Sequence, residues 1–247
     1  AGYCIPARGN YNSHLIPPIR RKQTAKGATV DLAAALDKLN SLLPLKARQS
    51  QLEPQLRGLH IAVLRQFATA GRPLSRDEVA QQLGDGDVDA ALARLAADDL
   101  VVLTPDRSQI VGAYPFTAEE RVHKVLVNGK TVHAMCALDA LAIAPMFETA
   151  TRIDSRCHVT DTPVEVHMQG ESLLSAKPGG VHVGIHWQGT SGCAAQSLCM
   201  EMVFLADAET AQRWQQQDSD NISVFELPDA VAFAGAYFRP LLVDTAV

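Results

Sequence analysis

The chain has 247 residues, of which 47% are hydrophobic and 20% charged, a composition that excludes a disordered, collagenous or coiled-coil protein. Its 22 Lys and Arg against 27 Asp and Glu give a net charge of -5, which argues against a nucleic-acid or membrane-surface protein. The charge is uneven. Residues 1–118 carry 14 basic and 11 acidic residues, whereas residues 119–247 carry 8 and 16, so we expect two differently built halves.

Residues 1–28 are rich in Pro, Gly, Asn and basic residues and predict a flexible tail. They lack the apolar centre of a secretory signal, and no run of 18 or more apolar residues predicts a membrane span. The five cysteines are an odd number without a Cys-x-x-Cys pair, a pattern that favours a reducing compartment over a disulfide framework. We therefore expect a cytoplasmic protein. The cysteines are Cys4, Cys136, Cys157, Cys193 and Cys199.

Residues 29–118 show helical periodicity and then a hairpin pattern. Helices are predicted over 29–45 and 56–70, a Ser-x-x-Glu capping box at Ser75 starts the next one, and a further helix starts at Asp87. Strands are predicted over 100–103 and 110–113. Short helices followed by a two-stranded ribbon are typical of a winged helix-turn-helix, so we predict a winged-helix-like helical domain.

The charges of this region disfavour DNA binding. The helix that would read bases has Arg94 as the only basic residue in its interior. Its flanks would repel phosphates, whose neutralisation by Lys and Arg supplies most non-specific affinity. A packing role is better supported. The flanking acidic residues are Asp85, Asp87, Asp89, Asp98 and Asp99.

Residues 119–247 predict an α+β domain. A hairpin is expected around Asn128-Gly129, and an Ala/Leu-rich helix over 134–144 is expected to stop at Pro145. Further strands are predicted over 150–153, 164–168, 181–187, 200–205 and 222–225, with a helix over 208–217 and an Ala-rich C-terminal stretch.

Ligand-type side chains concentrate in this acidic half. Cys136 and Asp139, at i and i+3 of the predicted helix, would share one face. A carboxylate beside a buried thiol can hold and pass on a proton, although a free Cys is more often a small core residue. His133 allows a Cys-His nucleophile, but no oxyanion loop accompanies it. The cysteine spacings do not match the ligand pairs of a structural zinc site.

Three segments in order carry a more specific signal. Residues 134–141 (AMCALDAL) resemble the Cys-Ala-Leu-Asp helix of organomercurial lyases, also called alkylmercury lyases. Residues 151–157 (TRIDSRC), followed by Thr162-Pro163-Val164, resemble the second cysteine segment of that family, and residues 196–199 (QSLC) resemble the third. Residues 71–76 (GRPLSR) and the helices after them resemble its N-terminal winged-helix-like domain.

The resemblance implies an enzyme that cleaves a carbon–mercury bond by protonation, giving a hydrocarbon and Hg(II). Cys136 and Cys199 would be the mercury-binding thiols, Asp139 their acidic partner, and Cys157 a structural cysteine. No organic cofactor is implied. Organomercury compounds would be the substrates, and cytosolic thiols or a mercuric reductase would accept Hg(II). The implied fold is α+β. A winged-helix-like helical domain, residues 29–118, follows the tail, and a mixed catalytic domain of the alkylmercury lyase type, residues 119–247, follows that.

Some positions depart from the family pattern. Met135 replaces a Trp, Leu198 a Phe, Ala195 an Arg, and Met200 the second Cys that some members have. These changes would reshape the site walls and alter the substrate range. Two alternatives remain open: a protein that sequesters mercury or copper without cleaving a bond, and a metal-sensing winged-helix regulator. Cys4 and Cys193 have no assigned role.

Overall fold

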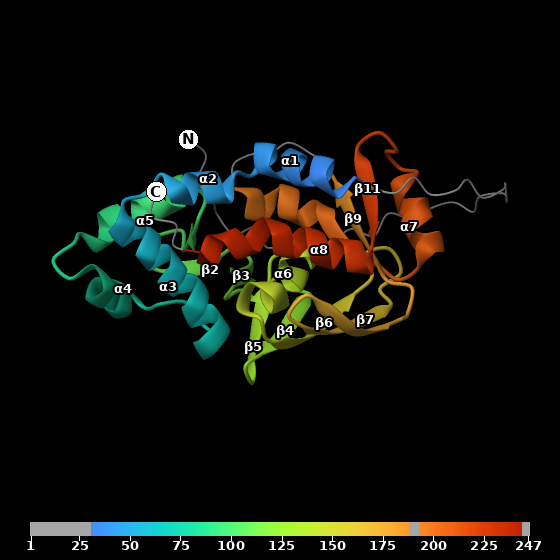
Figure 1. Cartoon of the computed structure of the whole chain (residues 1–247). Coiled ribbons are helices and arrows are strands. Elements are labelled where there is room, and N and C mark those ends of the chain that lie inside the picture. Colours follow the sequence, from blue (N-terminus) through green and yellow to red (C-terminus); the bar gives the residue numbers. More distant parts are fainter. Residues whose placement is uncertain (1–30, 188–192, 244–247) are drawn as a thin grey trace.

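The computed structural model describes residues 31–187 and 193–243. The predicted tail, residues 1–28, and Cys4 lie outside the described residues. Figure 1 shows a helical region at one end of the molecule, a large sheet below the helices labelled α6 and α8, and a small sheet at the other end.

Five helices open the described chain. Their bounds are α1 Leu32–Leu42, α2 Leu45–Ser50, α3 Pro54–Ala70, α4 Arg76–Leu83 and α5 Val88–Ala97. The helix predicted over 29–45 ends at Leu42, since Pro44 begins a separate short helix.

The predicted cap residues of this region are confirmed. Gly71 ends α3 with φ of 75°, a left-handed conformation that glycine adopts without the penalty other residues incur. Ser75 and Glu78 form the predicted reciprocal capping box of α4, and Asp87 accepts hydrogen bonds from the first backbone amides of α5.

The large sheet has eight antiparallel strands in the order β1-β2-β3-β5-β4-β6-β7-β8. Their bounds are β1 Val102–Leu103, β2 Ile110–Ala113, β3 Phe116–Thr117, β4 His123–Val127, β5 Lys130–Ala134, β6 Ala150–Arg156, β7 Pro163–Gln169 and β8 Ser172–Lys177. The Asn128-Gly129 turn joins β4 to β5 as predicted. Alternate residues of β6 and β7 are buried, so one face of the sheet packs on the core. The sequence analysis missed β3 and β8.

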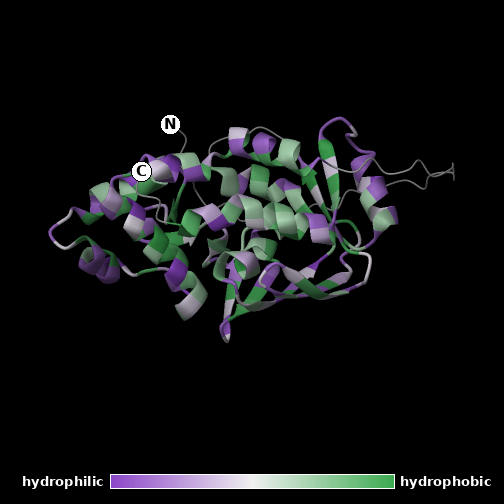
Figure 2. Cartoon of the chain, viewed as in Figure 1, coloured by the Kyte–Doolittle hydropathy of each residue, from purple (hydrophilic) through white to green (hydrophobic). Residues whose placement is uncertain are grey.

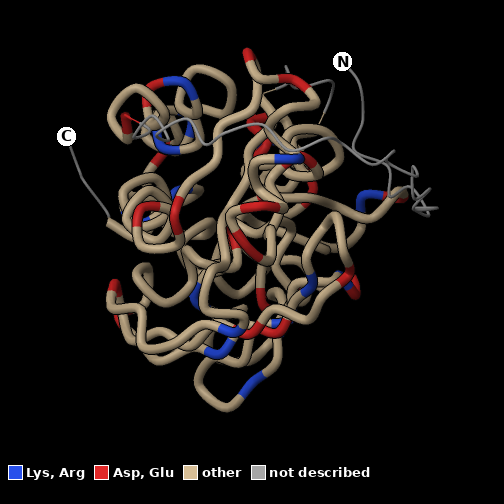
Figure 3. The backbone as a smooth tube through the Cα atoms, turned by 90° about the vertical axis from the view of Figure 1, so that its right-hand side faces the viewer, with Lys and Arg blue, Asp and Glu red and all other residues tan. Residues whose placement is uncertain are grey.

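The two regions predicted as separate domains share one sheet and one core. The β1-β2 hairpin continues through β3 to β5, and a single hydrophobic cluster extends from Ala35 in α1 to Leu241 near the C-terminus. The winged-helix assignment of residues 29–118 stays a prediction. Within Figure 3, acidic and basic residues are interspersed along the backbone.

Helix α6 (Ala137–Phe147) lies at the centre of the molecule. Residues 137–146 are all buried, because the helix packs against the large sheet on one side and α8 (Leu227–Phe238) on the other. A helix that is apolar on every face is one that is buried on every face. The predominantly green and pale colours of α6 and α8 in Figure 2 agree with this position.

Two details of the predicted helix were wrong. It begins at Ala137 rather than Ala134, because residues 130–134 pair with β4 as strand β5. It also continues past Pro145 to Phe147 before Glu148 ends it with φ of 50°. The proline lies against Gly235 of α8, where an added Cβ would meet the Pro145 ring at 3.3 Å, so the two helices approach closely at this point.

The small sheet has the antiparallel order β10-β9-β11 and packs against α7. The bounds are β9 His182–His186, β10 Met202–Leu205, α7 Ala208–Gln215 and β11 Ile222–Glu226. Three short 3-10 helices complete the described chain: η1 Ala194–Gln196, η2 Leu198–Glu201 and η3 Arg239–Leu242. Among the described residues, no helix is both long and apolar enough to cross a bilayer. The chain is thus a mixed α+β protein with a large antiparallel sheet.

Candidate functional site

Cys136 lies at the junction between β5 and α6. Its backbone is extended, with φ of -150°, and it is the N-cap of α6 rather than a residue inside the helix as predicted. Its Sγ accepts a hydrogen bond of 3.3 Å from the backbone amide of Asp139. The thiol therefore takes the place of the Ser, Thr, Asp or Asn oxygen that usually caps a helix.

Asp139, in the first turn of α6, is 1% exposed. Neither of its carboxylate oxygens has a hydrogen-bond partner among the described residues. Buried carboxylates are normally paired, because removing an ionised group from water costs several kcal/mol. Burial raises the pKa of Asp139 from its usual 3.8 to about 7, even though the nearby polar groups of Cys136 act to lower it.

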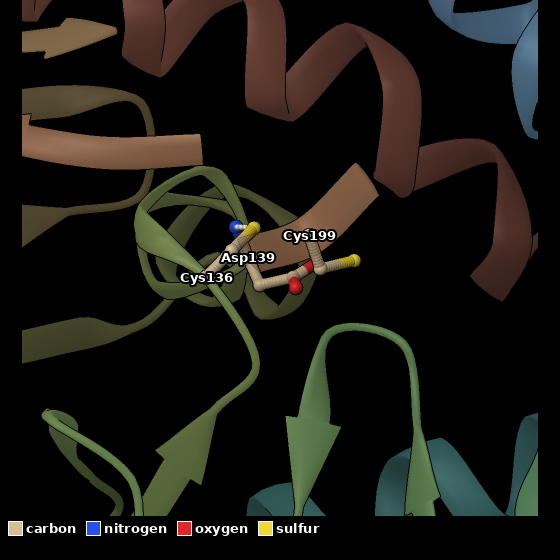
Figure 4. Close-up of side chains that lie close together, drawn as sticks. All are labelled: Cys136, Asp139 and Cys199. Carbon is tan, nitrogen blue, oxygen red and sulfur yellow. Dashed lines mark hydrogen bonds between the residues drawn. The ribbon is translucent and has the colours of Figure 1, made fainter. Parts of the chain in front are cut away.

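Cys199 reaches the same place from a distant part of the chain. It lies in η2, not directly before a strand as predicted, since β10 begins only at Met202. One ligand atom each from Cys136, Asp139 and Cys199 lies within 4.8 Å of the others, and all three residues are buried. In the view of Figure 4 the Asp139 carboxylate lies between the two sulfur atoms. The three residues that the resemblance assigned to one site are therefore brought together.

The environment holds protons on the two sulfurs. Burial raises the pKa of the Cys136 thiol well above its usual value, and the neighbouring Cys199 thiol and the charge of Asp139 raise it further. The neighbouring Cys136 thiol lowers the pKa of Cys199, but burial and the charge of Asp139 outweigh this effect, so the pKa of Cys199 is also raised. With a pKa of about 7, Asp139 is the one of the three groups that is partly ionised at neutral pH, so its carboxylate is available to accept a proton from a thiol that binds a metal.

Two side chains that sequence reasoning missed hold the segment that leads to Cys199. The Tyr114 hydroxyl accepts a hydrogen bond of 2.8 Å from the amide of Ala195 and donates one of 3.2 Å to Asp99 Oδ1. The other oxygen of Asp99 accepts from the amide of Ala194 at 3.2 Å. Arg48 of α2 lies 3.8 Å from this carboxylate. Two backbone amides of one short turn are thus fixed by side chains from α2, the end of α5 and the loop after β2.

Tyr114 is also close enough to the site to be affected by its charges. Burial raises the pKa of the Tyr114 phenol well above its usual value, and negative charge at Cys199 and Asp99 raises it further. Neither Tyr114 nor Asp99 belongs to a motif in the sequence. Their role depends on where the β1-β2 hairpin lies, which no local signal indicates.

The other candidate residues lie elsewhere. Cys157 is buried at the end of β6, where its Sγ accepts a hydrogen bond of 3.3 Å from the amide of Ala206. Cys193 is disulfide-bonded, which the pattern of five cysteines did not predict. The Nδ1 atom of His133 lies 3.0 Å from the amide nitrogen of Arg121, which donates to it, so this imidazole is engaged away from Cys136.

Two of the residues that depart from the family pattern have different surroundings. Met135 is 6% exposed, and its Cε approaches Gly112 so closely that an added Cβ there would lie 2.6 Å away. Met200, next to Cys199, is 36% exposed, and its sulfur accepts a hydrogen bond of 3.8 Å from Arg121. The former lies in the core beside Cys136, and the latter lies at the surface.

Comparisons with known proteins agree with this arrangement. The sequence profile described as alkylmercury lyase matches residues 116–239, half of the chain. An alkylmercury lyase of Pseudomonas putida is 27% identical over 156 residues, which cover 63% of this chain and 72% of the relative. An alkylmercury lyase of Streptomyces lividans is 25% identical over 154 residues, which cover 62% and 70%.

A solved structure shares the fold. The crystal structure of the mercury-bound form of MerB2 superposes with a TM-score of 0.69 at 20% sequence identity, covering 81% of this chain and 98% of the other. The profile match includes all three residues of the buried thiol and carboxylate cluster. This chain is a member of the alkylmercury lyase family.

Proposed function

We propose that this protein cleaves the carbon–mercury bond of alkyl- and arylmercury compounds by protonolysis, releasing a hydrocarbon and holding Hg(II). Cys136 and Cys199 are the mercury ligands, Asp139 is the proton carrier, and Cys157 is a structural thiol. The observation that carries the proposal is the convergence of two thiols and one unpartnered carboxylate within 4.8 Å in a buried site.

The donor set suits mercury. Soft thiolate ligands select soft metals, whereas carboxylate and imidazole ligands suit harder ones. Two sulfurs bound on opposite sides of one ion at about 2.3 Å each, the distance known for zinc, are about 4.6 Å apart. The sulfurs of Cys136 and Cys199 lie within 4.8 Å of each other, so one mercury ion can bind both.

The reaction proceeds in three steps. The first thiol displaces a leaving ligand from RHg⁺ and loses its proton to that ligand or to solvent. Asp139 then removes the proton of the second thiol, which binds mercury as a thiolate. Finally Asp139 delivers this proton to the carbon as the Hg–C bond breaks, and the bonding electron pair leaves with the carbon as RH. Mercury stays divalent throughout, bound by both thiolates.

The buried carboxyl explains why a proton can move in both directions. A general acid or base works best when its pKa lies near the operating pH, and burial has brought the pKa of Asp139 to about 7. Positioned proton transfer typically contributes about 10²–10⁴ in rate. An Asp at its usual pKa would accept the thiol proton poorly and exist too rarely as the acid.

This carboxylate also argues against the two alternatives. A protein that only sequesters a soft metal needs thiols, and gains nothing from burying an unpartnered acid at a cost in stability. A DNA-binding regulator needs a basic reading helix, but Asp87 and Asp98 flank α5, Asp89 lies in its first turn, and Arg94 is its only basic residue.

Turnover requires an acceptor for Hg(II), and we infer that small cytosolic thiols or a mercuric reductase remove it. We further infer a cytoplasmic location, because such acceptors work where thiols are kept reduced. The chemistry of the three side chains calls for no organic cofactor.

The test is direct. Reduced protein is incubated with methylmercury or phenylmercury and excess thiol, and methane or benzene is measured by gas chromatography. We expect more than one mole of hydrocarbon per mole of protein. The Cys136→Ala variant is the control, and a yield no greater than that of the control would rule out the lyase.

A further inference from the structure

A third sulfur lies beside the two thiols. Met202 is 3% exposed, and its Sδ accepts a hydrogen bond from the Cys136 thiol, with 3.7 Å between the sulfur atoms. It is the first residue of β10, three positions after Cys199, and its backbone ends η2. The short segment from 199 to 202 thus supplies two sulfurs to one place.

The distance between these sulfurs matches shared coordination. Two sulfurs bound at about 2.3 Å to one tetrahedral ion are about 3.8 Å apart, close to the separation of two hydrogen-bonded sulfurs, so an ion can replace the shared proton with little movement of either sulfur. Cys136 Sγ and Met202 Sδ are 3.7 Å apart. An ion bound to Cys136 on the side of Met202 would therefore have both sulfurs within reach.

The chemistry of the thioether suits such a role. Methionine sulfur is soft and polarisable, and thioethers share with thiolates a preference for soft metals. It carries no charge and has no proton to lose, so its burial costs little, in contrast to that of Asp139. Its hydrogen bond from Cys136 shows that a sulfur lone pair is directed toward the thiol.

We propose that Met202 is a third soft ligand of the mercury site, binding Hg(II) together with Cys136 and Cys199. This inference rests on the proposed function and deepens it. Once the carbon has left, the thioether takes up coordination that the organic group gave up and slows the loss of Hg(II) until a competing thiol removes it. Met202 then sets the rate of product release rather than that of bond cleavage.

The experiment compares Met202→Leu with Met168→Leu. Leucine preserves the volume of the side chain, and such exchanges usually cost less than about 1.5 kcal/mol. Met168, in β7, is equally buried but lies on the large sheet, so its variant controls for the loss of a core thioether. Each reduced protein is loaded with one equivalent of mercuric chloride alone. The ¹⁹⁹Hg chemical shift and the rate of Hg(II) transfer to excess glutathione are then measured.

We expect Met202→Leu to move the shift toward that of a two-coordinate dithiolate and to speed transfer about tenfold, the lower end of what metal-site variants cause. Met168→Leu should match the wild type in both measurements. Identical shifts and rates for all three proteins would overturn the proposal.

X-ray absorption of the wild-type Hg(II) complex provides a test that needs no variant. Two short mercury–sulfur distances and one longer one are expected, and a shell of two sulfurs only would also overturn the proposal. Because mercuric chloride is the probe, the result does not depend on bond cleavage. A wild-type protein that shows the third sulfur but yields no hydrocarbon would sink the lyase and leave the role of Met202 intact.

Discussion

The two sides of the site are built in different ways. Cys136 and Asp139 belong to one helix start, where three residues of sequence separation and one backbone hydrogen bond bring them together. Cys199 belongs to a short 3-10 segment whose preceding turn is held by Tyr114 and Asp99, about 80 and 100 residues earlier. The first arrangement survives as long as α6 forms. The second requires the helical region to be docked on the large sheet, so this region contributes to the site without supplying a ligand.

The largest effect on turnover is expected at Asp139, on the side of the site that one helix start builds. Asp139→Asn keeps the size of the side chain but removes its acid–base function, so we expect turnover to fall by about 10²–10⁴ while one equivalent of Hg(II) still binds. Hydrocarbon yield and mercury titration measure the two properties. Cys157→Ala, which removes a buried thiol outside the cluster, should keep most of the turnover. Undiminished turnover in Asp139→Asn would remove the carboxyl from the mechanism.

The same carboxyl should make stability depend on pH. Because the pKa of Asp139 is raised from 3.8 to about 7 on folding, the folded chain binds its proton more tightly than the unfolded chain. This stabilisation is complete below about pH 4 and is lost as the pH rises through 7. Three pKa units correspond to on the order of 4 kcal/mol.

Urea unfolding at pH 4.5, 6 and 8 measures this dependence. The free energy of unfolding of the wild type, relative to that of Asp139→Asn, should decrease over this range and become constant above pH 8. Parallel pH profiles for the two proteins would mean that the carboxyl is solvated in the folded state.

The tertiary side is tested at Tyr114. Tyr114→Phe keeps the ring in the core but removes the acceptor for the Ala195 amide, so we expect turnover to fall about tenfold through displacement of Cys199, as positioning losses can. The rate of alkylation should change at Cys199 and not at Cys136, which mass spectrometry of the peptides resolves.

Tyr237→Phe is the matched control. It removes another buried hydroxyl, one that donates to the carbonyl of Leu43 and has no described bond to the 194–195 turn. The variant should lose about 1 kcal/mol of unfolding free energy, a loss similar to that of Tyr114→Phe, but its turnover should persist. Equal loss of turnover in both variants would show that Tyr114 acts through stability alone.

The smallest effect is expected far from both sides. Ser75→Ala breaks the capping box of α4, which should cost about 1 kcal/mol of unfolding free energy. Turnover per folded molecule should be unchanged, since α4 supplies no contact to the turn before Cys199 among those described. A fall in turnover at constant stability would extend the dependence of the site to α4.

Much of the local structure could be predicted. The capping box at Ser75, the Asn128-Gly129 hairpin and most strands follow from patterns of a few residues, because short-range hydrogen bonds and turn conformations decide them. The predicted helix start at Ala134 and stop at Pro145 were wrong, since residues 130–134 pair as a strand and the helix continues through Pro145 to Phe147, where it packs against α8.

The sequence by itself determined the chemical identity of the site. Three cysteine segments in order, with an aspartate three residues after the first thiol, are sufficient to point to the family and to the residues that carry its chemistry. The tertiary structure alone decided that Cys199 and Met202 meet this helix start, that Tyr114 binds the turn before Cys199, and that the Asp139 carboxyl has no partner among the described residues. The physical reason is that a pKa and a metal geometry depend on what packs around a group, and long-range packing leaves no periodic trace in the sequence.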